Sequence, residues 1–296
     1  MNLSKKQYDV LVMLAETKTQ LSQREIAEKA KFSVGMANKT VRELEDAGYA
    51  ENGKITEKGL AALEPYKVKR AIIIAAGFGS RLVPITLNTP KPLVRVKGKR
   101  IIDSVLDAVV AAGINDIVIV RGYLGEQFDQ LLYKYPMIKF VENPIYNEAN
   151  NISSVYCVKD YIQNAYIIEA DLLVYNPSLI TKYQYSSNYL GVKTERTDDW
   201  CFHVENGFIK KLSVGGLDCY HTYGISYWTG DDGKRLAKHL DEEFHAPGGK
   251  ELYWDEVALS RHINEYDIRV RECSFDDIIE IDTFGELKKL DPTYGV

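Results

Sequence analysis

The stretch IIIAAGFGSRL at residues 72–82 constrains the fold most, because an apolar run stops abruptly at a pair of glycines. The run from Ile72 to Ala76 shows no alternation of polar and apolar side chains, which is typical of a strand buried on both faces of a parallel sheet. Gly77 and Gly79 follow at once, and such glycines allow a tight turn whose backbone N–H groups face a ligand. The sequence therefore predicts a phosphate-binding turn at the end of a buried strand.

Apolar runs of this kind recur after residue 71 and alternate with helical patterns. Residues 115–122 hold a second run, and the segment 101–113 between the two has helical periodicity and ends at a glycine. Parallel strands need a crossover connection, which is usually a helix. We therefore expect residues 71–296 to form an α/β, Rossmann-like domain with a mostly parallel mixed sheet.

Residues 1–66 follow a different pattern. Three stretches of helical periodicity each begin just after a serine, which is a favoured N-cap: Ser4, Ser22 and Ser33. An Asn-Gly pair at 52–53 then separates two short strand candidates, and this pair is the strongest short hairpin signal. Helices followed by a hairpin are the order of a winged helix-turn-helix domain, which this segment resembles. We place a linker at residues 67–70, before the α/β domain.

Composition narrows the class of protein further. The chain has 296 residues and a formal net charge of −5, with no long block of one sign, which argues against a protein whose whole surface binds nucleic acid or anionic lipid. The four cysteines are scattered without a CxxC pair, so neither a zinc site nor a disulfide framework is predicted. We see no signal-peptide pattern and no apolar stretch of membrane-spanning length, so we expect a cytoplasmic protein that is not associated with a membrane.

Three kinds of phosphate-binding turn contain paired glycines. A Walker A loop would place Lys and then Ser or Thr after the second glycine, but Ser80 and Arg81 stand there instead. A dinucleotide-binding turn would have a third glycine, but Leu82 occupies its position. The remaining kind continues into TPKPL at residues 89–93. In this turn Arg81 would contact the phosphates of a nucleoside triphosphate, and Lys91 would be stiffened by its flanking prolines.

The string AAGFGSRLVPITLNTPKPLV resembles the nucleotidyltransferase superfamily signature along nearly its whole length. Within that superfamily, residues 71–291 are similar to the bacterial CTP:phosphocholine cytidylyltransferases, through stretches such as GINDIVIVRGYLGEQFDQL, YGISYWT and ELYWDEVALSRHI. The resemblance implies that the cytidylyl group of CTP is transferred to phosphocholine with release of pyrophosphate. It also implies Arg81 and Lys91 as catalytic residues, and nucleotide-binding residues at Ala75, Ala76, Gly77, Gly79, Ser80, Tyr123 and Asn151.

Nucleotidyl transfer brings several anions together, so it needs cationic side chains and a divalent metal held by carboxylates. Asp171 closes an apolar strand, where ligands gather in open α/β sheets, and Asp282 follows 111 residues later at another strand end. Either residue could instead cap the next helix. The resemblance places metal ligands at both positions, and Mg²⁺ suits hard oxygen ligands beside a polyphosphate. Glu169 departs from the Asp commonly found there, and we expect it to support the metal ligands.

A trimethylammonium group cannot donate a hydrogen bond through its nitrogen, so aromatic faces and a nearby carboxylate recognise it. All three tryptophans lie in the second half of the chain, each near Tyr, Phe or an acidic residue. The resemblance implies a substrate cage made of Trp200, Tyr253, Trp254, Asp255 and Glu280. For Trp228 we favour a place in the core, which is the usual fate of Trp.

Other functions stay open at this point. Phosphoethanolamine or 2-aminoethylphosphonate would use the same fold with a smaller ammonium that donates hydrogen bonds, and a sugar phosphate would need hydrogen-bonding side chains. A different class is a transcriptional regulator that senses CTP or phosphocholine. Residues 1–66 hold ten Lys or Arg and ten Asp or Glu, which is a weak balance for binding phosphates. DNA binding and homodimerisation are therefore both predictions for this segment, and Lys31, Lys39 and Arg42 could line one face of the recognition helix.

Overall fold

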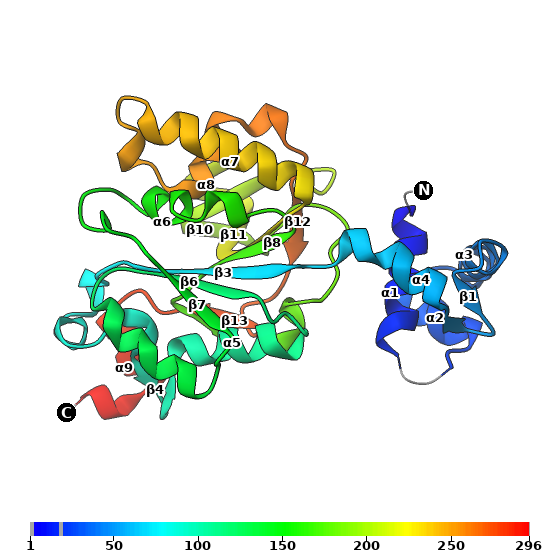
Figure 1. Ribbon diagram of the computed structural model, residues 1–296, viewed down its shortest axis with the longest axis horizontal. Helices are drawn as coiled ribbons and strands as arrows, with labels where there is room; N and C mark the ends of the chain where they lie inside the picture. The colour runs from blue at the N-terminus through cyan, green and yellow to red at the C-terminus, as the bar shows by residue number, and fades with distance from the viewer. Residues whose placement is uncertain (1–2, 18–19, 296) are drawn as a thin grey trace. The chain divides into compact units, whose positions relative to one another are not determined.

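The computed structural model describes residues 3–17 and 20–295, and the chain divides into two compact units (Figure 1). The first unit comprises Met1–Lys67 and Tyr183–Tyr185, and the second comprises Val68–Lys182 and Ser186–Val296. We propose that the units correspond to the two predicted domains. The Tyr183–Tyr185 excursion has no counterpart among the sequence predictions. Across the described ranges, no helix is long and apolar enough to cross a membrane.

The first unit has the winged helix-turn-helix order. Its elements are α1 (Lys5–Glu16), α2 (Gln23–Ala30), α3 (Val34–Asp46), β1 (Ala50–Glu51), β2 (Lys54–Ile55) and α4 (Glu57–Leu63). The three predicted N-caps are confirmed, because Ser4, Ser22 and Ser33 each accept a hydrogen bond from a backbone N–H of the first helical turn. Asn52 and Gly53 have positive φ angles, which a two-residue hairpin turn between β1 and β2 requires.

The Tyr183–Tyr185 segment completes an aromatic cluster within this first unit. The ring of Tyr185 stacks on Tyr66 with centroids 5.6 Å apart, and both rings contact Tyr8 of α1. The Tyr185 hydroxyl donates a hydrogen bond to the backbone carbonyl of Leu3, whose own N–H donates to the Tyr66 hydroxyl. Three segments that are far apart in the sequence therefore share one small core.

The second unit is built on a seven-stranded sheet. Its strands are β3 (Arg70–Ala75), β6 (Ile117–Arg121), β7 (Ile138–Glu142), β8 (Ala165–Glu169), β10 (Asn188–Glu205), β11 (Phe208–Trp228) and β12 (Arg269–Glu272). They lie in the order β10-β12-β11-β8-β3-β6-β7. Pairings from β8 to β7 are parallel, whereas β11 pairs with β8 in the antiparallel direction. The predicted mixed, mostly parallel sheet is confirmed.

Helices cover both faces of this sheet (Figure 1). They are α5 (Ile101–Ala111) on one face, and α6 (Ile152–Tyr156), α7 (Gly230–His245) and α8 (Trp254–Glu256) on the other. Strand β3 shows the consequence, because Ile73 belongs to the core cluster beside α5 while Ile72 and Ile74 belong to the opposite cluster. Burial on both faces accounts for the continuous apolar run in the sequence.

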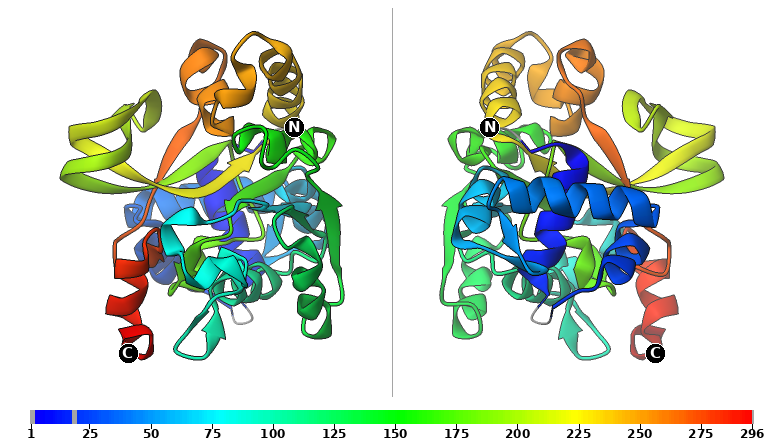
Figure 2. Two further views of the ribbon diagram at one scale, coloured as in Figure 1. Left: turned by 90° about the vertical axis from the view of Figure 1, so that its left-hand side faces the viewer. Right: turned by 90° about the vertical axis from the view of Figure 1, so that its right-hand side faces the viewer.

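Two further features place functional residues. Outside the large sheet, the structure has β4 (Arg95–Val96), β5 (Lys99–Arg100), β9 (Leu172–Val174), β13 (Ile278–Glu280) and α9 (Phe284–Leu290). Strands β9 and β13 pair in the antiparallel direction, with Leu172 opposite Glu280. The ribbon of β10 and β11 is much longer than the other strand pairs and curls away from the sheet (Figure 2).

Candidate active site

A cavity of about 500 Å³ opens where β3 and β8 end, at the carboxyl edge of the parallel strands. Its volume is in the range of small-molecule sites. Most of the predicted site residues line it: Ala75, Ala76, Gly77, Gly79, Ser80, Arg81, Lys91, Asn151, Asp171, Trp200, Tyr253, Asp255, Glu280 and Asp282. Two predicted residues, Tyr123 and Trp254, do not line it.

The glycine turn forms one wall of the cavity. Gly79 has φ +67°, and a Cβ there would lie 2.9 Å from the Cβ of Lys91, so both the backbone conformation and the close approach require glycine. Nothing lies within 4 Å of the position that a Cβ of Gly77 would occupy, which leaves the backbone of the loop open to the cavity. The turn leads into a 3₁₀ helix, Ser80–Leu82, which places Arg81 at the cavity wall.

Two cations of this wall pair with two acidic residues. The Lys91 Nζ lies 2.7 Å from the Oδ2 of Asp171 and 3.1 Å from the Oδ1 of Asp282, and the Arg81 guanidinium lies 2.7 Å from the same Asp282 oxygen. Burial opposes the charge on Lys91, but its two carboxylate neighbours outweigh burial and raise its pKa. Lys91 therefore stays protonated in a nearly buried position, where a phosphate could replace a carboxylate as its partner.

Antiparallel pairing explains why Asp171 and Asp282 meet despite their separation in the sequence. Asp171 directly precedes β9 and Asp282 follows β13, so the pairing of these strands brings both residues to the same end. The backbone N–H of Ile281 donates a 3.1 Å hydrogen bond to the carbonyl of Asp171. The backbone N–H groups of Asp282 and Thr283 each donate a 2.8 Å hydrogen bond to the same carboxylate oxygen of Glu286, which fixes the start of α9 beside them.

The acidic residues fit a hard divalent cation. Carboxylate oxygens of Glu169, Asp171 and Glu280 lie within 4.8 Å of one another. The Oδ1 of Asp171 is buried and has no hydrogen-bond partner in the structure, so it is an oxygen still in need of a cation or donor. Oxygen ligands of this kind suit Mg²⁺. Asp282 joins this group through Lys91, which contacts both aspartates.

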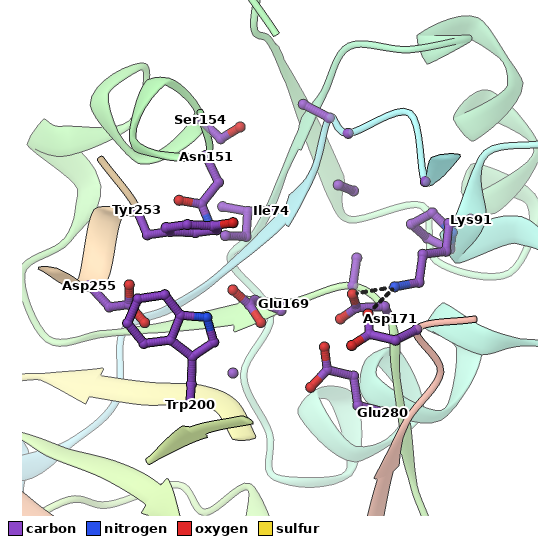
Figure 3. Close-up of a pocket in the computed structure, with 18 of the residues that line it drawn as sticks. Ile74, Lys91, Asn151, Ser154, Glu169, Asp171, Trp200, Tyr253, Asp255 and Glu280 are labelled. Atoms are coloured by element: carbon purple, nitrogen blue, oxygen red, sulfur yellow. Dashed lines mark hydrogen bonds and ion pairs between the residues drawn. The ribbon is translucent and has the colours of Figure 1, made fainter. Parts of the chain in front are cut away.

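The opposite end of the cavity combines carboxylates with rings (Figure 3). The edge of Trp200 faces the ring of Tyr253 with centroids 5.4 Å apart, and Asp255 accepts a 3.5 Å hydrogen bond from the hydroxyl of Tyr189. In Figure 3 Glu169 lies between this end and the Lys91 end. Burial raises the pKa of Asp255 to about 6.

The same effect is stronger for two other carboxyls of the cavity. Burial, followed by the neighbouring Asp171, raises the pKa of Glu169 well above its ordinary value, and the same two causes act on Glu280. The attraction of Lys91 lowers the pKa of both carboxyls, but it does not outweigh burial and the neighbouring acidic groups. A cationic ligand would lower the free-energy cost of ionising these buried carboxyl groups, so the cavity favours a ligand with a positive charge.

The predicted cage position of Trp254 is wrong. Its side chain is 1% exposed and packs in the core between the ring of Tyr189, with centroids 6.2 Å apart, and that of Trp228, at 6.1 Å. Its neighbours Tyr253 and Asp255 point into the cavity from the start of α8, so Trp254 points away from it. Trp228 is fully buried, as expected.

Tyr123 also lies outside the cavity lining. Its hydroxyl donates a hydrogen bond to the carbonyl of Leu87, and its ring makes an edge contact with Phe78 in the glycine turn. Tyr123 therefore packs against the glycine turn on the side that does not face the cavity. Asn151 lines the cavity, and its Oδ1 accepts a 2.9 Å hydrogen bond from the backbone N–H of Trp254.

Sequence reasoning missed several lining residues of the β10–β11 ribbon. These are Tyr189, Asp199, Thr222 and Gly224. Gly224 lies within YGISYWT, a stretch that carries the family resemblance, and a glycine inside a strand signals a close approach of other atoms. That signal could have identified Gly224, whereas nothing local marks the other three.

Comparison with known proteins agrees with this geometry. Residues 70–192 match the family described as Nucleotidyl transferase, and residues 3–61 match Winged helix-turn-helix DNA-binding. The chain is 39% identical over 228 residues to 2-aminoethylphosphonate cytidylyltransferase of Lancefieldella rimae, which covers 76% of this chain and 92% of that protein. It is 33% identical over 223 residues to choline-phosphate cytidylyltransferase of Streptococcus pneumoniae, covering 75% and 96%.

A solved structure extends the comparison to three dimensions. The CTP:phosphocholine cytidylyltransferase of Streptococcus pneumoniae superposes with a TM-score of 0.71 at 34% identity, over 77% of this chain and 99% of that one. Fold and cavity together define a nucleotidyltransferase. The chain belongs to the cytidylyltransferase family of these enzymes, with a winged helix-turn-helix region before the catalytic fold.

Proposed function

We propose that the protein transfers the cytidylyl group of CTP to 2-aminoethylphosphonate, releasing pyrophosphate. The observation that carries this proposal is the division of the cavity into a cationic wall at Lys91 and Arg81 and an opposite end at Asp255, with the carboxylate of Glu169 between them. An acceptor with a phosphonate at one end and a primary ammonium at the other matches this division. Relatives named for 2-aminoethylphosphonate and for phosphocholine support the class of acceptor.

The geometry allows direct transfer without a protein nucleophile. The open backbone of the Gly77–Gly79 turn would hold the triphosphate, while Lys91 and Arg81 would exchange their aspartate partners for phosphate oxygens. A phosphonate oxygen of the acceptor would then attack the α-phosphorus of CTP, and the bond to pyrophosphate would break. Mg²⁺, held by Asp171 with Asp282 or Glu280 beside it, would neutralise charge on the phosphates. The residues would thus act by position and charge.

The head-group end favours a primary ammonium over the trimethylammonium first suggested by the sequence. With Trp254 in the core, the rings that line the cavity near Asp255 are those of Trp200, Tyr253 and Tyr189. The carboxylates of Asp255 and Glu169 lie beside these rings, and they accept hydrogen bonds that an NH₃⁺ group donates and a trimethylammonium cannot. Binding of an ammonium would also relieve the unfavourable ionisation of the raised-pKa carboxyls.

An acceptor panel tests this proposal. Pyrophosphate release is measured for 2-aminoethylphosphonate, phosphoethanolamine, phosphocholine and glucose 1-phosphate, each with CTP, UTP, GTP and ATP in the presence of Mg²⁺. We expect the highest kcat/KM for CTP with 2-aminoethylphosphonate. A clear preference for phosphocholine would reverse the choice of acceptor within the family, and turnover with the sugar phosphate alone would contradict an ammonium site.

A second proposal concerns the first unit, where we infer DNA binding. Helix α3 leaves Val34, Gly35, Lys39 and Arg42 exposed along its first turns, while Ala37 and Val41 face the core of the unit. This is the arrangement of a recognition helix that reads the major groove. The match of residues 3–61 to a DNA-binding winged helix supports the same proposal.

Fluorescence anisotropy with duplex fragments from the upstream region of its own gene tests this proposal. We expect binding that weakens with salt, and a Lys39→Ala and Arg42→Ala double variant should bind about tenfold more weakly or worse. Lys29→Ala, a change at an exposed position of α2, serves as the matched control. If the parent protein binds none of the fragments at low salt but is dimeric by light scattering, the unit serves dimerisation.

A further inference from the structure

Glu169 is held against the backbone of the neighbouring strand. It is the last residue of β8, and the carboxyl group leans over Gly224 of β11. A Cβ on Gly224 would lie 2.3 Å from the Oε2 of Glu169 and 2.6 Å from its Cδ and Cγ. The side chain therefore occupies the space that any larger residue at position 224 would need. Glu169 and Gly224 together shape this wall of the cavity.

The carboxylate of Glu169 has no polar partner of its own. Within residues 3–17 and 20–295 it forms no hydrogen bond and no ion pair, whereas Asp255 is bonded by the Tyr189 hydroxyl and Asp171 by Lys91. The carboxylate is half-buried and lines the cavity, so it is free to accept a hydrogen bond from a ligand there. Its position between the Lys91 end and the Trp200 end puts it within the path of an acceptor molecule (Figure 3).

We propose that Glu169 determines acceptor specificity, by accepting a hydrogen bond from a primary ammonium and by filling the volume that a trimethylammonium would need. The proposal rests on the proposed function, because it concerns the acceptor of that same reaction. Asp255 and Tyr189 are the described residues that line this part of the cavity beside Glu169. Of the three, Glu169 alone packs over Gly224 and has a carboxylate that accepts no hydrogen bond.

Two variants separate size from charge. Glu169→Asp removes one methylene and withdraws the carboxylate toward β8, which opens the cavity. Glu169→Gln keeps the shape and removes the charge. The test pair of acceptors is phosphoethanolamine and phosphocholine, because they differ only in the three methyl groups on nitrogen. The kcat/KM of each acceptor is measured at saturating CTP, together with the KM for CTP and the Mg²⁺ concentration at half activity.

We expect Glu169→Asp to raise the ratio of kcat/KM for phosphocholine over phosphoethanolamine by about tenfold or more. Glu169→Gln should lower kcat/KM for phosphoethanolamine by about 10- to 100-fold, which is the range for a lost charged hydrogen bond, and should affect phosphocholine less. The KM for CTP should stay unchanged. The carboxylate oxygens of Glu169 lie within 4.8 Å of those of Asp171 and Glu280, so the Mg²⁺ concentration at half activity distinguishes a role in specificity, which leaves it unchanged, from a role as a metal ligand, which raises it. Glu148→Asp is the matched control, because Glu148 is exposed and does not line the cavity.

A third variant keeps the test decisive if a Glu169 variant does not fold. Gly224→Ala needs no left-handed backbone, yet its methyl would displace the Glu169 carboxyl, and we expect it to lower kcat/KM for phosphoethanolamine more than for phosphocholine. Equal losses for both acceptors, or a shifted Mg²⁺ requirement with an unchanged ratio, would overturn the role in specificity. If the parent enzyme uses no amino-alcohol phosphate or phosphonate with CTP, the proposed function itself has failed.

Discussion

The two ends of the cavity handle charge in opposite ways. At the glycine turn, Lys91 and Arg81 already have carboxylate partners, and the opposite charges satisfy one another. Toward the other end, Glu169 and Asp255 form no ion pair within the described residues, and burial raises the pKa of both. The charges at the glycine turn are neutralised by ion pairs within the protein. At the other end, a bound cation would supply the counter-charge for the carboxylates.

This difference indicates how each end should respond to its ligand. A phosphate at the first end has to compete with Asp171 and Asp282 for the cations, so its binding exchanges one ion pair for another. An ammonium at the second end supplies a charge that the protein lacks, so its binding adds ion pairs. Variants at the first end should therefore damage turnover, and variants at the second end should change acceptor affinity and stability.

The largest effect is expected from the acidic residues at the first end. Asp171→Asn and Asp282→Asn should each lower kcat by about 10³-fold, because a metal contributes several kcal/mol of charge stabilisation. The measurement is a Mg²⁺ titration of pyrophosphate release, with circular dichroism to confirm folding. Glu286→Gln, which perturbs the start of α9 without removing a cavity carboxylate, is the control. Two variants that keep the parent's titration curve would place the metal elsewhere.

A smaller loss is expected from the cations at this end. Lys91→Ala should lower kcat by about 10²-fold, and Arg81→Ala by less, because Lys91 is nearly buried between two carboxylates while Arg81 is mostly exposed. The exposed Lys99→Ala serves as the control. Steady-state kinetics with saturating acceptor gives the comparison. A folded Lys91→Ala protein with near-normal turnover is incompatible with the proposed mechanism.

At the second end, Asp255 should make stability depend on pH. Below about pH 4 it is protonated in both folded and unfolded chains and has no effect. As the pH rises toward 6 the unfolded chain releases this proton first, because burial raises the folded pKa to about 6. The folded state therefore loses stability with rising pH.

Asp255→Asn removes this penalty. Relative to the parent, the variant should gain about 3 kcal/mol of unfolding free energy between about pH 4 and pH 8, since the pKa of Asp255 rises by about two units and one unit is worth about 1.4 kcal/mol. Urea denaturation at both pH values gives the difference in unfolding free energy between variant and parent at each pH. The change in that difference between the two pH values reports Asp255, because the other titrating groups contribute equally to both proteins. A difference that does not change with pH would show that Asp255 ionises normally.

The smallest effect distinguishes two neighbouring tryptophans. Trp200→Ala should raise the KM for the acceptor by about 5- to 30-fold and leave the KM for CTP unchanged, because a ring beside a cation is worth about 1–2 kcal/mol. Trp254→Phe should lower the unfolding free energy by about 1–3 kcal/mol without changing either KM, because its ring packs in the core. The opposite pattern for the two residues would reverse their assignment.

Sequence patterns predicted the parts of the site that depend on local backbone chemistry. The glycine turn, Arg81 and Lys91 lie within one short segment, and Gly79 is needed for its positive φ and for the approach of Lys91. Strand ends together with the family resemblance pointed to Asp171 and Asp282, and both line the cavity. Periodicity likewise predicted the buried strands and the three serine caps.

The failures depend on orientation and on distant pairing. Tyr253, Trp254 and Asp255 are consecutive, so which of them faces the cavity depends on how α8 packs against β10 and β11, and no local pattern contains that information. Tyr189 and Gly224 enter the site because β11 pairs with β8, a contact between strands that are far apart in the chain. Propensities cannot predict such pairing, because packing over the whole sheet decides it.

The Tyr183–Tyr185 excursion bears on how this gene could have been assembled. The first 67 codons do not encode a complete winged helix, since Tyr185 stacks on Tyr66 and bonds Leu3 from a position far downstream. A fusion of only those residues to another enzyme would leave Tyr66 and Leu3 without their contacts with Tyr185, and part of the core would be exposed. A chimera built in the laboratory therefore needs a replacement for the Tyr185 ring and for its hydrogen bond to Leu3.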